Sequence, residues 1–364
     1  MPTVQKPIFR ILYLGKDITK DISESLISVT YNDKLVGETD EIDITLEDTE
    51  ALWRGPWYPK KKDRIKLQMG YDDLLVDCGE FEVDQIEMQG PPDTVSIRGL
   101  ATWVTSAMRT RASTAHEGKT LKQIAEFVAS KHGYTVEGKI FTIRLERSTQ
   151  NRETDLEYLK RIANEYGYVF SIRGKKLVFT SVYDLEAGKP VYVIDRSDLM
   201  RYSVRDSNIG TYKEAVVKHH SPQKKEVQSK SISFEKVDIN KGSGVGQTDS
   251  VDVLEIRTKT ENPQQAEAKA KASLHAANSK QVEGSLTLQG YPLLVAGNNF
   301  ELTGMGVLSG KYHILQSTHT ITKSGGYVTD LSIKRVSGEG AAKQKTKQKE
   351  KANPTNKIEI VKLT

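Results

Sequence analysis

Histidines are the side chains of this chain with the clearest potential for acid–base or metal chemistry near neutral pH. The sequence has seven of them, and His219 and His220 are adjacent. Neighbouring side chains on a strand point to opposite faces, and no carboxylate or cysteine cluster stands at ligand spacing around this pair. His319 falls at the end of an expected strand near Tyr327, where a packed, hydrogen-bonded ring is favoured over a catalytic base. We therefore expect neither a metal site nor a histidine-based active site.

Other patterns that support catalysis or ligand binding are incomplete in this sequence. The serines lack the G-x-S-x-G turn of a nucleophile elbow. Residues 240–246, NKGSGVG, are glycine-rich, but they lack the Gly-Lys-Ser/Thr ending and the strand–helix context of a phosphate-binding loop. Carboxylates are abundant, yet nothing singles out two that would face each other across a cleft, as a glycosidase requires. We therefore predict that the chain is not an enzyme and binds no cofactor.

A binding alternative comes from residues 116–125, HEGKTLKQIA. They resemble the opening of a LysM peptidoglycan-binding repeat, in which G-x-T-L-x-x-I-A starts the first helix. A LysM module has two helices between its strands, whereas here an extended run at 140–145 precedes the second helix, so the similarity covers one helix. A peptidoglycan-binding or cell-wall-hydrolysing role stays open as the alternative function.

The composition limits the class of the protein. The chain has 364 residues, 28% of them charged, and a mean hydropathy of −0.51, so it is long enough for two or three well-solvated domains. Of its net charge of +5, a net +4 falls in residues 341–351, which hold five lysines and one glutamate. The remaining +1 does not indicate a surface that recognises nucleic acid.

The apolar residues and the cysteine count bear on compartment. No run approaches the roughly 18 apolar residues of a membrane helix. The start, MPTVQKPIFRILYLGKD, lacks the basic region and long apolar core of a signal peptide. The single cysteine, Cys78, excludes disulfides within the chain and is expected to be a small buried residue. We expect no membrane insertion and folding in a reducing cytoplasm.

Residues 8–99 are expected to be almost entirely β structure. Short runs alternate apolar and polar residues, and turn-forming residues separate them. Short strands at this spacing predict a small barrel or sandwich. The expected strands are 8–14, 26–31, 41–46, 64–69, 81–87 and 94–98, and the expected turns are 15–17, 32–33, 72–73 and 90–92.

One of these strands stands out because it separates apolar from acidic residues. In the segment 40–48, Ile42, Ile44 and Leu46 share one face, and acids share the other. A solvated outer face explains this pattern fully, and a sheet edge offered to a neighbouring subunit is the functional alternative. The candidate structural or interface residues of this segment are Asp40, Glu41, Asp43, Glu47 and Asp48.

The middle of the chain changes character. Helical spacing at 120–132 and 154–166, followed by a hairpin at 168–172 and 177–180, predicts a small α/β module. Short strands follow at 191–194, 215–218 and 231–234, and a helix is expected at 263–277, capped by Asn262. The domain boundaries that we predict are 1–108 for a first β-barrel, 109–198 for the α/β module, 199–336 for a second β-barrel, and 337–364 for a flexible Lys-rich extension.

The predicted second barrel is based on an internal echo. Residues 297–335 contain three alternating runs separated by glycines, and residues 63–98 repeat them in the same order. The matched segments are 63–67 with 298–302, 79–83 with 310–314, and 95–98 with 331–334. The fold class that we predict is therefore a β-rich α+β fold with two similar small β-barrels and an inserted α/β module. Candidate structural or interface residues in the second copy are Gly310, Tyr312, His319, Gly326, Tyr327 and Thr329.

Four segments, in this order, resemble the phage late control D family, the tail hub proteins of contractile phages and phage-tail-like bacteriocins. They are 40–49 (DEIDITLEDT), 90–99 (GPPDTVSIRG), 150–167 (beginning QNRETDLEYL) and 310–331. The third segment is also similar to the hub half of type VI secretion spike proteins. Together they cover roughly residues 8–336. The extension from residue 337 departs from the expected pattern.

The resemblance implies a structural role in a virion tail or tail-like particle assembled in the bacterial cytoplasm. It implies a homotrimer at the base of the tail tube, above a trimeric spike protein. Three chains with two similar barrels each would present six similar units, so the ring would match a sixfold tail tube protein and a threefold spike. Further baseplate or tape-measure proteins are implied as partners, and the 337–364 extension is a candidate contact for them.

Overall fold

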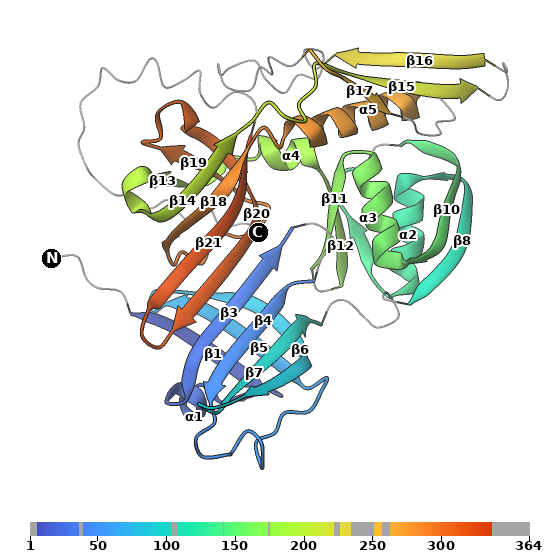
Figure 1. Cartoon of the computed structure of the whole chain (residues 1–364). Helices are drawn as coiled ribbons and strands as arrows, with labels where there is room; N and C mark the ends of the chain where they lie inside the picture. Colours follow the sequence, from blue (N-terminus) through green and yellow to red (C-terminus); the bar gives the residue numbers. More distant parts are fainter. Residues whose placement is uncertain are drawn as a thin grey trace.

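Two sets of mostly antiparallel strands form the largest part of the molecule, and one hydrogen-bonded sheet runs through both (Figure 1). The computed structural model describes residues 6–35, 39–102, 108, 110–140, 142–173, 175–221, 226–233, 251–256 and 263–336. The glycine-rich loop 240–246 and the extension 337–364 lie outside these ranges. Within them, none of the helices has the length and apolar character that crossing a bilayer requires.

The first strand set comes from the amino-terminal third of the chain. It comprises β1 (Pro7–Tyr13), β2 (Lys16–Asp17), β3 (Leu26–Lys34), β4 (Glu41–Glu47), β5 (Arg64–Tyr71), β6 (Leu74–Gln89) and β7 (Thr94–Ala101), with the short helix α1 (Thr19–Ser23) before β3. The strand order is β3-β4-β7-β6-β5-β1-β2, and every pairing is antiparallel.

The second strand set comes mostly from the carboxyl-terminal part of the described chain. It comprises β13 (Pro190–Asp195), β14 (Leu199–Asp206), β18 (Val282–Gln289), β19 (Asn299–Thr303), β20 (Gly310–Thr322) and β21 (Gly326–Arg335), with one-turn 3-10 helices η2 (Arg196–Asp198) and η4 (Gly306–Leu308) in its connections. The order is β14-β18-β21-β20, and β19 and β13 follow on the other edge of β20. The pairing of β20 with β3 joins the two sets into one sheet.

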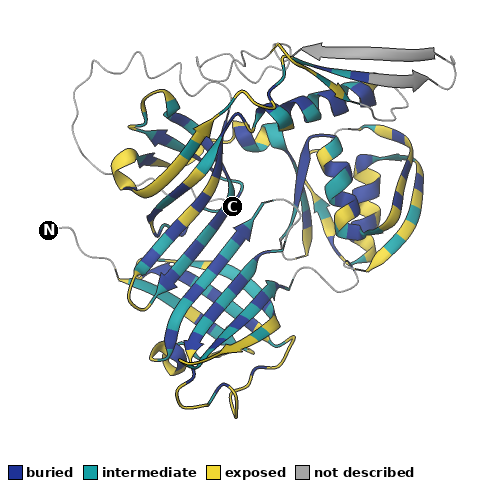
Figure 2. Cartoon of the chain, in the orientation of Figure 1, coloured by how far each residue is buried: buried dark blue, intermediate teal, exposed yellow. Residues whose placement is uncertain are grey.

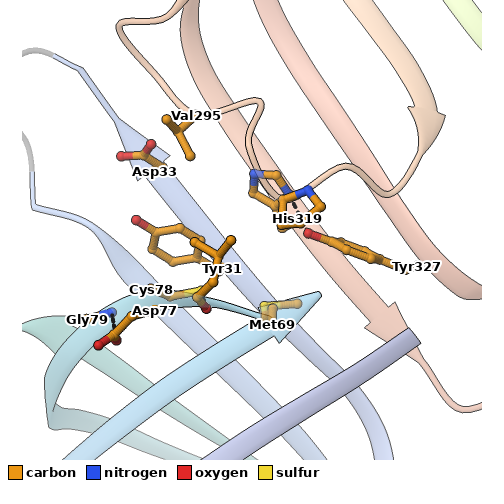
Figure 3. Close-up of a pocket in the computed structure, with 11 residues that line it drawn as sticks. Tyr31, Asp33, Met69, Asp77, Cys78, Gly79, Val295, His319 and Tyr327 are labelled. Carbon is orange, nitrogen blue, oxygen red and sulfur yellow. Dashed lines mark hydrogen bonds between the residues drawn. The ribbon is translucent and has the colours of Figure 1, made fainter. Parts of the chain in front are cut away.

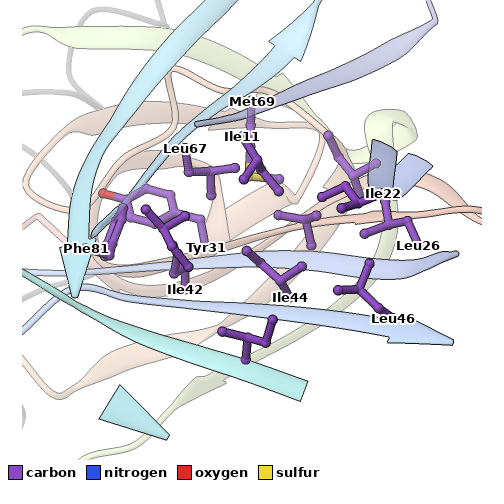
Figure 4. Packing of buried hydrophobic residues seen from close by; sticks show 14 of the residues in the cluster. Ile11, Ile22, Leu26, Tyr31, Ile42, Ile44, Leu46, Leu67, Met69 and Phe81 are labelled. Atoms are coloured by element: carbon purple, nitrogen blue, oxygen red, sulfur yellow. The ribbon is translucent and has the colours of Figure 1, made fainter. Parts of the chain in front are cut away.

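Each strand set has its own apolar core. Along β4 the side chains of Ile42, Ile44 and Leu46 are buried while the alternate residues face outward, as the sequence predicts (Figure 4). Full burial of such a side chain contributes on the order of 2 kcal/mol. Ile321 and Tyr327, from β20 and β21, pack in the core of the first set. The core of the second set is separate and includes Phe300, Tyr312 and Ile333, among others.

Five strands of each set repeat the same pairings in the same register, whereas β1 is antiparallel to β5 and β13 is parallel to β19. The strand order β3-β4-β7-β6-β5 of the first set corresponds to the order β14-β18-β21-β20-β19 of the second. β6 is therefore the equivalent of β20, and β3 is the equivalent of β14. The equivalent facing pairs are Leu67–Gly79 and Leu302–Gly310, Ile65–Phe81 and Phe300–Tyr312, Ile44–Ile97 and Leu286–Leu331, Ile42–Gly99 and Gly284–Ile333, and Leu26–Leu46 and Leu199–Leu288.

Irregularities recur at the same places as well. The β6–β7 pairing shifts register between Val83 and Gln85, and the β20–β21 pairing shifts at the equivalent place, between Ile314 and Gln316. A further pair of equivalent shifts lies in the β3–β4 pairing, between Leu26 and Ser28, and in the β14–β18 pairing, between Leu199 and Arg201. A β-bulge re-aims every residue beyond it. Matching bulges therefore extend the similarity beyond the alternation that any two strands share.

Two sequence predictions in this region are wrong in detail. The segment 95–98 was expected to match 331–334, but by strand pairing it matches 329–332, a shift of two residues that keeps the same face. Gly99 occupies the position that Ile333 occupies in the second set. Matching the two segments by their apolar residues alone therefore displaces them by two positions. The expected turn at 32–33 lies inside β3, because this strand continues to Lys34 beside β20.

The middle of the chain forms a separate α/β module with its own core. It contains β8 (Arg111–Thr120), α2 (Leu121–Lys131), β9 (Thr135–Glu137), β10 (Arg144–Thr154), α3 (Asp155–Glu165), β11 (Tyr168–Arg173) and β12 (Lys176–Ser181). Both helices begin with a capping box, at Thr120 with Gln123 and at Thr154 with Glu157. The extended run expected at 140–145 is displaced, because the strand begins at residue 144.

A smaller layer covers the top of Figure 1. Helix α5 (Pro263–Asn278) packs against β15 (Glu214–Ser221), which pairs with β16 (Glu226–Ser233) and β17 (Val253–Ile256). Helix α4 (Val182–Ala187) connects the module to the second strand set. β13 lies inside the range 109–198 predicted for the module, yet it pairs with β19 of the large sheet.

Candidate functional site at the junction of the strand sets

The junction between the strand sets is an antiparallel pairing of seven residue pairs between β3 and β20. On its outer face, the Thr318 hydroxyl donates a hydrogen bond to the Asn32 side chain over 2.7 Å. On its inner face, Tyr31 lies opposite His319, and their rings stack with centroids 6.1 Å apart. The backbone ladder, the polar outer pairs and the Tyr31–His319 pair on the inner face together make the junction a continuous piece of sheet.

His319 is a deeply buried titratable group of this junction, with 2% of its surface exposed. The hydroxyls of Tyr327 and Thr329 lie 2.9 and 3.1 Å from its Nδ1. Burial lowers the pKa of His319 to about 4, although the carbonyl of Leu294 favours the protonated ring. The imidazole is therefore neutral at physiological pH and serves as a hydrogen-bonded core side chain. The sequence had favoured this interpretation over a catalytic base.

A cavity of about 520 Å³ opens beside His319, between the two strand sets (Figure 3). Tyr31 and Cys78 of the first set face Tyr327 and His319 of the second across it. Burial is the main cause that raises the pKa of the Cys78 thiol and of the Tyr327 hydroxyl. A thiol that keeps its proton is a weak nucleophile. These groups are therefore uncharged at neutral pH, which suits a packed joint rather than acid–base chemistry.

Further hydrogen bonds tie the loop 290–298 of the second set to the first. The carboxylate of Asp33 accepts a bond from the Ala296 amide over 2.8 Å. The hydroxyl of Tyr71 donates to the Gly290 carbonyl over 2.9 Å. Sequence reasoning missed Tyr31, Asp33 and Tyr71 as junction residues. The sequence signal that could have indicated them is a polar group at a strand position whose side chain faces the core.

The acids of β4 occupy a different place from the one that the edge hypothesis requires. β4 pairs with β3 on one side and with β7 on the other, so its backbone is not free to add a strand. The hypothesis of an edge at 40–48 is wrong. Its side chains bond within the chain: Glu41 pairs with Lys34 and Arg98, and Asp43 accepts bonds from the Ser96 hydroxyl.

The flanking acids divide between fold and solvent. Asp40 is buried and accepts a bond from the Lys34 amide. Asp48 is also buried, accepts from the Trp53 amide over 2.9 Å, and pairs with Arg54. Glu47, at the end of β4, is exposed. Of the acids at 40–48, Asp40 and Asp48 thus shape local turns.

The remaining candidates of the second set are framework positions. Tyr312 is fully buried, stacks on Phe300, and donates to the Leu308 carbonyl over 2.7 Å. Gly310 has a φ of +141°, and a Cβ there would lie 3.1 Å from the Arg335 guanidinium. Gly326, with a φ of +73°, starts β21 after the hairpin turn. The structure therefore brings His319, Tyr327 and Thr329 together and leaves Tyr312 and Gly310 in the neighbouring core.

A buried charged cluster joins α4 and α5 to the second strand set. Glu186 of α4 lies 2.9 Å from Nε2 of His275 and 2.6 Å from Nζ of Lys334. Burial alone would raise the pKa of Glu186, but the bond from His275 and the charge of Lys334 outweigh it and hold this pKa at about 2. Sequence spacing gives no sign of this cluster, because its members come from three distant elements.

Metal and peptidoglycan sites were also considered at the sequence level. Within the described residues, no group of three or more His, Cys, Asp or Glu side chains is placed to hold a metal ion. His219 and His220 lie on β15, and their side chains are outside the described part. The LysM-like segment 116–125 spans the end of β8 and the start of α2, and β10 separates α2 from α3.

Comparison with known proteins places these observations in a family. A family model described as phage tail baseplate hub (GPD) matches residues 82–325. The chain is 28% identical over 242 residues to a probable baseplate hub protein of Escherichia phage 186, covering 63% of this chain and 61% of that protein. It is 28% identical over 213 residues to the probable baseplate hub protein of Escherichia phage P2, covering 57% of this chain and 54% of that one.

The fold itself has a solved counterpart. A 43 kDa tail protein of prophage MuSo2 from Shewanella oneidensis superposes with a TM-score of 0.66 at 16% identity, over 90% of this chain and 98% of that one. The curated relatives are matched over less than two thirds of their length. The 16% identity to the MuSo2 tail protein shows a shared fold and no more.

Proposed function

The chain belongs to the phage tail baseplate hub (GPD) family, as the sequence predicted, and we propose that it is the structural hub of a contractile tail or tail-like particle. In this proposal it acts without catalysis, as a trimer that joins the tail tube above to a spike below. It would be assembled in the cytoplasm of the bacterial host. Its partners would be tube, spike and other baseplate or tape-measure proteins.

The observation that carries the proposal is the recurrence of one pairing pattern in both strand sets. Two sets with matched registers and matched bulges are two copies of one building block, which we interpret as two small β-barrels. A trimer would then contain six such blocks. A ring of six similar blocks in three chains presents near-sixfold symmetry to a tube and threefold symmetry to a spike.

The junction geometry supports this arrangement over a freely hinged pair of domains. Seven facing residue pairs, the Tyr31–His319 stack and the Asp33–Ala296 bond fix one block against the other. A rigid two-block chain can define a constant step around a ring. A flexible linker between the blocks would let that step vary.

The test of the function is assembly. The full chain is mixed with the spike and tube proteins of the same particle, its mass is measured by light scattering, and the complex is imaged by electron microscopy. We expect a trimeric ring with six similar densities between tube and spike. A chain that stays monomeric in the presence of its spike would overturn the proposal.

A further inference from the structure

The strand that pairs with β20 at the junction has no counterpart beside β6, the strand equivalent to β20 in the first set. β20 pairs along one edge with β19 over residues 310–313 and with β3 over residues 316–322. Its equivalent, β6, pairs along that edge with β5 over residues 74–82. Among the described strands, none occupies the edge of β6 at 85–89, the place where β3 sits on β20.

The other half of the junction is open in the same way. β3 has β4 on one side and β20 on the other. Its equivalent, β14, has β18 on one side and ends the sheet on the other. The Ser207 amide donates to Gln281, toward β18, so by alternation the amides of Asp206 and Val204 point to the open edge. Two complementary strand edges are thus unpaired in the described chain.

We propose that these two edges pair with each other between copies of this chain, β6 of one copy against β14 of the next. The inference rests on the ring-shaped trimer proposed above and specifies its contact. Carrying the β3–β20 register across the repeat places Glu87 of one copy opposite Arg205 of the next, and Met88 opposite Val204. Each contact between chains would then copy the contact within the chain, and six equivalent contacts close the ring.

The side chains at these edges fit the pairing. Glu87 is acidic, Arg205 is basic, and they stand where Thr318 and Asn32 share a hydrogen bond within the chain. Met88 is 41% exposed and Tyr202 is 45% exposed, whereas their equivalents His319 and Val29 are 2% and 0% exposed. Figure 2 shows β14 with largely exposed positions at the end of the sheet. The open edges therefore carry the apolar positions that the filled junction buries.

The residues that bound the β6 edge limit the contact to a short ladder. Pro91 and Pro92 directly follow Gly90 after the strand, and proline has no amide hydrogen to donate. Pairing would therefore stop at Gln89 and cover the five residues Gln85–Gln89. A short ladder that ends at prolines is specific for one register and discourages uncontrolled strand addition.

Disulfide trapping tests the register. In the variant Glu87→Cys/Arg205→Cys, directly opposite residues of an antiparallel pair have Cα atoms about 4.5–5.5 Å apart, within disulfide range. The matched control is Glu87→Cys/Arg201→Cys, in which the second cysteine lies four residues, or about 13 Å, along the same face of β14. The two single-cysteine variants retain Cys78 and measure its background cross-linking.

The full-length variants are assembled with the spike under reducing conditions, weighed by light scattering, and then oxidised. We expect the first variant, and not its control, to give a covalent trimer as the main product and no larger species. A trimer that forms under reducing conditions but cross-links no better than the control overturns the edge pairing and leaves the ring intact. Chains that remain monomeric with spike present overturn the proposed function itself, and a ladder beyond three subunits overturns the closed ring.

Discussion

Tyr31 and His319 lie directly opposite each other across the β3–β20 pairing, with ring centroids 6.1 Å apart and nearly parallel planes. One residue comes from the first strand set and the other from the last long hairpin of the described chain. Their contact therefore forms only when the two strand sets are docked against each other. Any condition that charges the imidazole acts on this docking.

Acidification is predicted to weaken the junction through His319. An unfolded histidine has a pKa near 6.5, whereas burial lowers that of His319 to about 4. Between these values the unfolded state binds the proton first, so stability is complete above pH 6.5 and falls by about 1.4 kcal/mol per pH unit toward pH 4. His319→Gln should reduce this slope, and part of it should remain because burial also lowers the pKa of His313 to about 4. Thermal unfolding of both proteins between pH 7.5 and 4.5 measures it, and equal slopes would contradict the assignment.

A second loss of stability is predicted at lower pH through Glu186. Its pKa of about 2 in the folded chain lies below that of an unfolded glutamate, near 4.3, so its contribution is present above pH 4.3 and disappears toward pH 2. Glu186→Gln should cost roughly 3–5 kcal/mol at neutral pH, because it leaves Lys334 buried without its partner charge.

The matched control for Glu186 is Glu283→Gln. Glu283 also pairs with a basic residue, Arg205, but the Arg205 side chain is exposed and that of Glu283 is partly exposed. Its loss should change the free energy of unfolding by less than about 1 kcal/mol. Chemical denaturation at neutral pH compares the two variants, and comparable losses would show that burial of the cluster has little weight.

A compensating pair of substitutions is predicted where Ile42 faces Gly99. A Cβ at Gly99 would lie 3.0 Å from the Ile42 side chain and 3.1 Å from that of Phe81. Gly99→Val should therefore destabilise the first strand set by about 1–3 kcal/mol through overpacking. The second set holds the reverse arrangement, with Gly284 facing Ile333.

The double variant Ile42→Gly/Gly99→Ile copies that reverse arrangement into the first set. Its loss in free energy of unfolding should be smaller than the sum of the losses of the two single variants, because the new isoleucine fills the space that Ile42 leaves. Urea denaturation of the wild type, both single variants and the double variant measures this coupling. Simple additivity would contradict the equivalence of the two facing pairs.

The α/β module is predicted to open locally when Asp155 loses its charge. Burial alone would raise the pKa of Asp155, but bonds from Lys131, His132 and Gln150 outweigh it and lower this pKa. Asp155→Asn breaks the tie between the end of α2 and the start of α3, at a cost of about 1.5–3 kcal/mol.

Hydrogen exchange distinguishes this local effect from a global one. Amides of α2 and α3 should exchange faster in Asp155→Asn, while those of β3 and β20 keep their protection. Glu126→Gln is the control, because Glu126 pairs with Lys122 at an exposed site of the same module. Faster exchange throughout the large sheet would mean that the module and the sheet unfold together.

The sequence indicated the regular parts of this fold because their patterns are local. β4 was predicted within one residue, since Ile42, Ile44 and Leu46 alternate with polar residues. The helices 120–132, 154–166 and 263–277 were confirmed within a residue or two, because caps and helical spacing mark them. The echo at 79–83 and 310–314 was placed in register by the same logic.

The parts that sequence reasoning missed depend on contacts between distant segments. β8 is formed by polar residues, RASTAHEGKT, and is held as a strand by β10, so it shows no apolar alternation. Asn32 and Asp33 are turn-forming types, but Asp33 is held in β3 by its bond to Ala296. The junction itself joins residues 28–34 to 316–322, and no local pattern records which edges meet.

The β3–β20 pairing also orders the events of synthesis. The first strand set leaves the ribosome early, but the strand that completes its sheet ends only at Thr322. Ile321 and Tyr327, which belong to its core, arrive later than every other core residue of that set. An incomplete chain therefore lacks both the seam and part of the first core. The first block is therefore finished only after translation has passed Tyr327, although most of its residues precede Ala101.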